Sequence, residues 1–104
     1  MDYSIKYSPT AVEDLDRIEK EVFQACSNKE QTKKYLEELY FKIYEKRQFP
    51  ESGTPLLLGK TFTGYRYTLY KSYIVFYLID DKDRVLFVDR ILFAKSNYLL
   101  ILGL

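Results

Sequence analysis

Histidine and tryptophan are absent from this sequence of 104 residues, and cysteine occurs only once. The missing histidine removes the commonest general base and the commonest metal ligand. The single cysteine, Cys26, cannot form an internal disulfide and cannot build a zinc site alone. We therefore expect no metal ion and no cofactor, and any chemistry must use arginine, lysine, tyrosine or carboxylate side chains.

Long apolar runs are also missing. No run approaches the roughly 18 residues that span a bilayer, and the opening MDYSIKYS is too polar for a secretory signal peptide. We therefore expect a cytoplasmic protein that does not enter a membrane. The length suits one domain, residues 1–104, and the apolar fraction of 47% is enough for a single core and argues against disorder.

The charges are distributed unevenly along the chain. Residues 1–57 contain nine Lys or Arg and eleven Asp or Glu, a balance of −2, whereas residues 58–104 contain seven and four, a balance of +3. The basic excess in the second half indicates an anionic partner, but it is much weaker than the patch of a dedicated nucleic-acid-binding protein.

The first part of the chain predicts a strand that runs into a helix. Residues 2–7 alternate between apolar and polar side chains, which is typical of a half-buried strand. Ser8 and Pro9 suit the start of a helix. Its apolar side chains recur every three or four residues, at Val12, Leu15, Ile18, Val22 and Cys26. Cys26 is therefore expected to be a buried structural thiol, and the charged residues of 13–21 to form a solvated face.

A second helix is predicted from about Asn28, because Ser27 and Glu30 form an S-x-x-E capping box. This helix should end before Phe49 and Pro50, since a residue that precedes proline disfavours helical dihedrals. Its apolar positions are Tyr35, Leu36, Leu39, Tyr40, Ile43 and Tyr44. With almost no linker between them, the two helices should form an antiparallel αα-hairpin.

The second half predicts a three-stranded antiparallel meander. Residues 50–55 have the composition of a loop, and residues 56–58 form an extended connection that leaves Lys60 exposed. The expected strands span 65–70, 73–79 and 84–93, with turns at 71–72 and 80–83. Because 73–79 is apolar on both faces, it should lie at the centre of a sheet that is covered on both sides.

The chain should end in a short helix that contains Tyr98, capped by Ser96 or Asn97. The expected fold class is therefore α+β: an N-terminal strand, an αα-hairpin, a three-stranded antiparallel meander and a short C-terminal helix.

In the order of its predicted strands and helices, the sequence resembles the RelE/ParE superfamily of bacterial toxins from type II toxin–antitoxin modules. The opening YSIKYSPTAVEDLDRI is similar to the first strand of that family and its motif s-P-x-A-x-x-D-L-x-x-I. The segment YRYTLYKSYIVFYLIDDKDRVLFVDRILFAKSNYLLIL is similar to the meander and C-terminal segment of the family. The resemblance covers nearly the whole chain.

The resemblance implies one of two activities. One branch of the superfamily cuts messenger RNA in the ribosomal decoding site, and the ParE branch poisons DNA gyrase without a known catalytic site of its own. Both are held inactive by an antitoxin that wraps the toxin. A cognate antitoxin is therefore an expected partner, with its C-terminal segment lying across the sheet and the helix hairpin.

The resemblance also implies candidate site residues. Arg66 matches the arginine of the second strand of the family, Arg90 the arginine near the end of the last strand, and Tyr98 the tyrosine of the C-terminal segment. Lys60 lies where the RNA-cutting branch often has a lysine. Phe93 stands where many members have histidine, which argues against conventional acid–base cleavage.

Metal-free cleavage of RNA requires a base, a cation for the phosphorane and an acid for the leaving oxygen. Arg66 and Arg90 suit the cationic role because a guanidinium binds phosphate bidentately. Tyr98 can donate a proton or stack on a base. Lys60 or Lys95 can supply the remaining acid, base or countercharge, with Glu51 as an outside candidate for the base. Each of these roles has an ordinary alternative, in which the arginines pair with carboxylates, Tyr98 packs in the core and the lysines are solvated.

Three functions remain open on this sequence. The favoured hypothesis is a toxin whose partner is ribosome-bound mRNA, with Arg66, Arg90 and Tyr98 as catalytic residues and Lys60 and Lys95 as RNA-binding residues. The alternative is a ParE-like inhibitor of DNA gyrase without catalytic activity of its own. The third is a non-toxic member that only binds its antitoxin.

Overall fold

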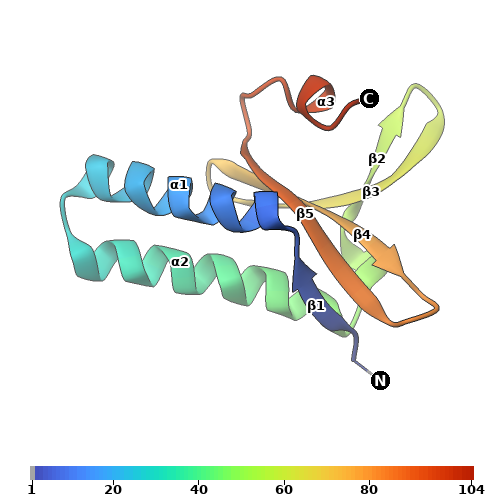
Figure 1. The fold of residues 1–104 in the computed structure, drawn as a ribbon, viewed down its shortest axis with the longest axis horizontal. Helices are drawn as coiled ribbons and strands as arrows, with labels where there is room; N and C mark the ends of the chain where they lie inside the picture. Colours follow the sequence, from blue (N-terminus) through green and yellow to red (C-terminus); the bar gives the residue numbers. More distant parts are fainter. Residues whose placement is uncertain (1) are drawn as a thin grey trace.

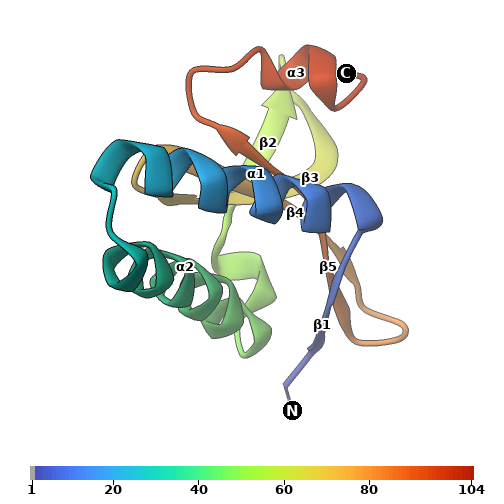
Figure 2. The same cartoon turned by 60° about the vertical axis from the view of Figure 1, so that its left-hand side comes forward.

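A five-stranded sheet forms the centre of the protein in the computed structural model, which describes residues 2–104. The elements in chain order are β1 (Ser4–Tyr7), α1 (Pro9–Cys26), α2 (Lys29–Tyr44), the 3-10 turns η1 (Glu45–Arg47) and η2 (Pro50–Ser52), β2 (Thr54–Leu58), β3 (Thr61–Tyr70), β4 (Tyr73–Asp80), β5 (Val85–Phe93) and α3 (Tyr98–Ile101). The helices α1 and α2 lie side by side against one face of the sheet, and α3 lies apart from them (Figures 1 and 2). The predicted α+β fold is confirmed.

The helix hairpin begins and turns at capping side chains. Ser8 caps α1 by accepting a hydrogen bond from the Ala11 N–H at 2.9 Å, with Pro9 at the first helical position. The helix ends at Ser27 in the left-handed region, with φ of 53°. Asn28 then caps α2 by accepting from the Gln31 N–H at 3.0 Å. The hairpin is as predicted, but Asn28 performs the capping that the sequence suggested for Ser27.

The sheet has the strand order β1-β5-β4-β3-β2. The first strand pairs in parallel with β5, and all other neighbours are antiparallel. Strand β4 is central, and residues 73–77 are buried, as the apolar pattern on both faces predicted. Residues 56–58 were predicted as an extended connection, but they belong to strand β2, which pairs with β3 through a turn in which Gly59 has φ of +64°. The meander therefore has four strands.

Two apolar clusters cover the two faces of the sheet. The larger cluster lies between the sheet and the helix hairpin. It joins Leu15, Ile18, Leu39 and Ile43 to buried residues of β4 and β5, namely Tyr73, Val75, Tyr77, Leu86, Val88 and Ile91. The smaller cluster lies on the opposite face, which we call the open face. Its buried members are Leu56, Ile74, Phe76 and Leu92, and α3 packs on them through Tyr98, Leu99 and Leu102.

Two expectations for the helical surface are wrong. Cys26 is only half buried, with its Sγ 3.4 Å from the Thr32 hydroxyl oxygen and 3.5 Å from the Asn28 carbonyl oxygen, because α1 extends past the sheet at this end. Asp14 was placed on a solvated face, yet it is 1% exposed, whereas Val12 of the predicted apolar stripe is 48% exposed. The helix is thus rotated so that Asp14 faces the sheet.

No helix described between residues 2 and 104 has the length and apolar character needed to cross a membrane.

Candidate functional site

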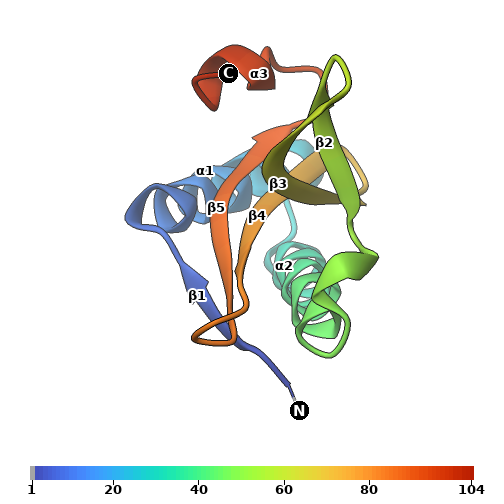
Figure 3. The same cartoon turned by 90° about the vertical axis from the view of Figure 1, so that its right-hand side faces the viewer.

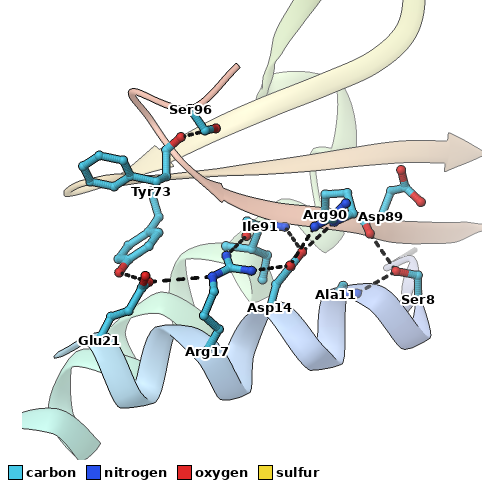
Figure 4. Close-up of polar contacts among 11 residues, drawn as sticks. Ser8, Ala11, Asp14, Arg17, Glu21, Tyr73, Asp89, Arg90, Ile91 and Ser96 are labelled. Atoms are coloured by element: carbon cyan, nitrogen blue, oxygen red, sulfur yellow. Dashed lines mark hydrogen bonds and ion pairs between the residues drawn. The ribbon is translucent and has the colours of Figure 1, made fainter. Parts of the chain in front are cut away.

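Asp14 and Arg90 form an ion pair between α1 and the edge of β5 (Figure 4). The Arg90 Nε donates to Asp14 Oδ2 at 2.8 Å, and its Nη2 donates to Oδ1 at 3.0 Å, so the contact is bidentate. The side chain of Asp14 is 2% exposed and that of Arg90 is 23% exposed. Arg90 is therefore paired with a carboxylate, the ordinary alternative to a phosphate-binding role.

The Asp14 carboxylate also accepts a hydrogen bond from the backbone at an unpaired edge of the sheet. Strand β1 pairs with β5 only as far as Val88, which leaves the outer edge of the following residues without a strand partner. There the Ile91 N–H donates to Asp14 Oδ2 at 2.9 Å, and Arg17 Nη2 donates to the Ile91 carbonyl oxygen at 3.1 Å. Two side chains of α1 thus satisfy the backbone groups that another strand would otherwise pair.

These contacts also determine the charge state of Asp14. Burial acts to raise the pKa of Asp14, but hydrogen bonds from Arg90, the Ile91 N–H and Arg17 outweigh it and hold the pKa below its usual value. The carboxylate is therefore ionised at neutral pH, and its partners are needed to keep it so.

The lowered pKa of Asp14 predicts a loss of stability in acid. The unfolded carboxyl titrates near pH 3.9, so the stabilising contribution is complete above that pH and is lost as the pH falls through the lower pKa of the folded state. We expect the free energy of unfolding of the wild type to decrease below about pH 4, and that of Asp14→Asn to decrease less steeply over the same range. Urea denaturation at a series of pH values measures both slopes, and equal slopes would contradict this assignment.

Arg66 points to a different part of the molecule. Its Nη1 donates to the carbonyl oxygens of Glu51 and Gly53 at 3.2 and 3.1 Å, and its guanidinium lies 5.4 Å from the Phe62 ring centroid. Beside it, the Tyr77 hydroxyl donates to the Pro50 carbonyl oxygen at 2.5 Å and accepts from the Gly53 N–H at 3.0 Å. Arg66 and Tyr77 together hold the turn η2 against the sheet. Glu51 contributes its backbone carbonyl to this contact.

The remaining candidates lie elsewhere. Tyr98 packs on the open face, with its ring centroid 5.2 Å from that of Phe76. Lys60 is exposed in the turn between β2 and β3, as predicted, and Lys95 is exposed in the segment between β5 and α3. Phe93, in the position of the missing histidine, is 45% exposed, and its ring centroid is 6.1 Å from that of Tyr73.

The structure does not bring the predicted catalytic residues together. Arg66 and Arg90 lie on β3 and β5, with β4 between them, and their hydrogen bonds point away from each other, toward η2 and toward α1. Tyr98 lies on the open face among apolar side chains. The buried floor of the open face is apolar, formed by Leu56, Ile74, Phe76 and Leu92. The roles assigned to these three residues remain predictions.

Asp14 and the contact between Tyr65 and Asp89 escaped the sequence reasoning. Asp14 was hidden among charged neighbours, although it follows Ala11 by three residues and precedes Ile18 by four, which places it on the buried stripe. On the open face, the Tyr65 hydroxyl donates to Asp89 Oδ2 at 2.8 Å. Burial and this contact raise the pKa of Tyr65 to about 12, so the phenol stays protonated at neutral pH.

Comparison with known proteins identifies the family. Residues 5–98 match the family model described as the ParE toxin of the type II toxin–antitoxin system parDE. A search of curated proteins finds no match. The chain belongs to this toxin family, and the resemblance to the RelE/ParE superfamily is confirmed.

Solved structures of both branches share the fold. The chromosomal ParDE system of Pseudomonas aeruginosa has a chain that matches with a TM-score of 0.70 at 16% identity, over 89% of this chain and 97% of that one. A mutant of the Escherichia coli toxin RelE in complex with a peptide of its antitoxin matches with a TM-score of 0.65 at 17% identity, over 100% and 96%. The Mycobacterium tuberculosis RelBE2 complex matches with a TM-score of 0.61 at 19% identity, over 89% and 99%.

Proposed function

We propose that this chain is a toxin that acts by binding DNA gyrase and that it cleaves no RNA. The observation that carries the proposal is the engagement of both candidate arginines inside the fold. Arg90 is held by a buried carboxylate and Arg66 by two backbone carbonyl groups. A phosphate that displaced Asp14 from Arg90 would leave a buried carboxylate without its partner, which is costly.

The open face supports the same proposal. In a metal-free ribonuclease, a base, an acid and a phosphate-binding cation must converge on one reacting atom. Here the open face carries an apolar cluster covered by α3, and the Tyr65 hydroxyl on that face, which stays protonated, donates its hydrogen bond to Asp89. The family model that matches is described as a ParE toxin, and the resemblance described above associates the ParE branch with gyrase, which supports the proposal.

A cognate antitoxin completes the proposal. The solved structures that share this fold include complexes of toxins with antitoxins. An antitoxin bound to this chain would cover the surface that binds the target. Because both proposed partners, gyrase and the antitoxin, are expected in the cytoplasm, we also propose that this protein is cytoplasmic.

Induction of the chain alone in cells tests the proposal. RNA ends and DNA breaks are mapped in the same culture, before and after growth arrest. We expect DNA breaks covalently linked to gyrase, with transcripts remaining intact. The ribonuclease hypothesis makes the opposite prediction: translation-dependent cuts in mRNA with no gyrase-linked breaks. Unimpaired growth on induction would favour a non-toxic member of the family.

A further inference from the structure

The backbone of β1 points alternately toward β5 and away from it. Figure 3 shows β1 at one edge of the sheet and β2 at the other. The Ser4 N–H donates to the Arg84 carbonyl oxygen at 2.9 Å, at the start of the parallel pairing with β5. The Ser8 N–H donates to the Val88 carbonyl oxygen at 2.9 Å, just after the end of β1. The odd-numbered residues of this segment therefore direct their N–H and C=O groups outward.

The outward groups of β1 are only partly satisfied. The Tyr3 N–H donates to the Arg47 carbonyl oxygen at 2.9 Å. For Ile5 and Tyr7, the backbone N–H and C=O groups have no hydrogen-bond partner within residues 2–104. Unpaired groups in a row along a strand edge form a template for another strand.

The other edges of the sheet are less open to a further strand. Strand β2, at the opposite edge, contains Pro55, which has no N–H to offer. Where β5 extends beyond its pairing with β1, Asp14 and Arg17 already bind the backbone of Ile91. The outer edge of β1 is therefore the favoured place for strand addition.

An apolar groove of about 390 Å³ lies beside this edge. Ile5 and Tyr7 line it from β1, and Tyr40, Phe41 and Tyr44 line it from α2. The three α2 side chains are 42%, 60% and 48% exposed, although they are aromatic. Unpaired backbone and exposed aromatic rings thus occur side by side, and an added strand can cover both, because its alternate side chains point to one face.

We propose that an extended segment of the cognate antitoxin adds to β1 as a sixth strand of the sheet. Its backbone pairs with Ile5 and Tyr7, and every second side chain, which must be apolar, packs on Tyr40, Phe41 and Tyr44. This inference rests on the antitoxin named in the proposed function, and it specifies where and in what conformation that antitoxin binds.

A peptide-like partner suits this edge because its own backbone groups are free to pair. The E. coli toxin RelE, which shares this fold, binds a peptide of its antitoxin. An extended antitoxin segment brings such free groups, and it becomes ordered as it binds.

A second copy of the chain fits the edge less well. In the two-fold pairing that joins Ile5 to Tyr7 of the other copy, the two Lys6 side chains would stand directly opposite each other, and like charges in that position are destabilising. In the pairing centred on Ile5, Tyr7 would face Tyr3 of the other copy, whose N–H is already bound by Arg47.

Amide hydrogen exchange of the full chain tests the pairing directly, without and with purified cognate antitoxin. In the free chain, the amides of Ile5 and Tyr7 should exchange about tenfold faster, or more, than those of Ser4 and Ser8, which are hydrogen-bonded. With the antitoxin bound, we expect this difference to disappear, because the new strand protects the outward amides.

Two variants of one residue provide the matched comparison. Ile5→Pro removes the outward N–H, and Ile5→Ala shortens the same side chain but keeps that N–H. Both should have similar melting temperatures, because proline is tolerated in an edge strand where its nitrogen faces away from the neighbouring strand. We expect the dissociation constant for the antitoxin to be about tenfold higher for Ile5→Pro than for Ile5→Ala.

Each contrary outcome has a distinct meaning. If the wild type does not bind its antitoxin, the antitoxin part of the proposed function fails and takes this inference with it. If the antitoxin binds but Ile5 and Tyr7 keep their fast exchange, or if the two variants bind equally well, the inference alone is overturned. It is also overturned if these amides become protected when the free chain is concentrated, which would indicate a second copy, or if Ile5→Pro weakens the action on gyrase but not antitoxin binding.

Discussion

Replacing Asp14 by alanine is expected to lower the free energy of unfolding by about 3–5 kcal/mol, the cost of breaking a buried ion pair by removing one partner. The substitution leaves Arg90 without its bidentate acceptor and the Ile91 N–H without a partner. Unfolding in urea, followed by circular dichroism, measures the loss. Because a domain of this size has a total stability of about 5–15 kcal/mol, the variant should remain folded only marginally.

Asp16→Ala provides the matched control. It removes the same side chain from the same helix, two residues away, at an exposed position. We expect its free energy of unfolding to lie within about 0.5 kcal/mol of the wild type. If Asp14→Ala costs no more than Asp16→Ala, the closure of the β5 edge by α1 is not a structural requirement.

Replacing Gly53 by alanine should produce the second large effect. A β-carbon at this position would lie 2.0 Å from the Tyr77 hydroxyl oxygen, which is buried and fixed by its hydrogen bond to the Pro50 carbonyl group. The backbone and the ring must shift to relieve the overlap, so we expect a loss of about 1–3 kcal/mol, the usual cost of overpacking. Thermal and urea denaturation measure the loss.

A double-mutant cycle isolates the cause. Tyr77→Phe removes the hydroxyl oxygen that an added β-carbon would strike, so Gly53→Ala should cost less in that background than in the wild type. The exposed neighbour Ser52→Ala is the control, with an expected change within about 0.5 kcal/mol. Strictly additive losses for Gly53→Ala and Tyr77→Phe would mean that the overlap with the hydroxyl oxygen does not determine the effect, since the ring atoms Cζ and Cε1 would still lie 2.8 and 2.9 Å from the added β-carbon.

The order of elements was predictable because local signals agreed with the fold. Ser8 and Pro9 begin α1 as expected, the apolar run of β4 lies at the centre of the sheet, and the terminal helix contains Tyr98. Strand β2 was missed because three consecutive leucines show no alternation. Its strand character comes from pairing with β3, which a local pattern does not encode.

The arrangement of the candidate site was less predictable, for a physical reason. Strand periodicity indicates which face a side chain occupies, but a long guanidinium reaches whichever acceptor the tertiary fold offers. Arg90 finds Asp14 from a helix 76 residues earlier in the sequence, and Arg66 finds the carbonyl groups of a turn 13 and 15 residues earlier. Such long-range partners arise only from packing, so the matching of motifs could not show that the two guanidinium groups are directed toward different parts of the fold.

The engagement of the arginines leads to the central claim, that this toxin acts on gyrase without catalysis of its own. A reconstituted assay tests it most directly: purified toxin is added in parallel to gyrase with supercoiled DNA and to translating ribosomes with a defined mRNA. We predict that gyrase–DNA cleavage complexes accumulate in the first reaction and that the mRNA stays intact in the second. Cleavage of the ribosome-bound mRNA, with no effect on gyrase, would contradict the claim.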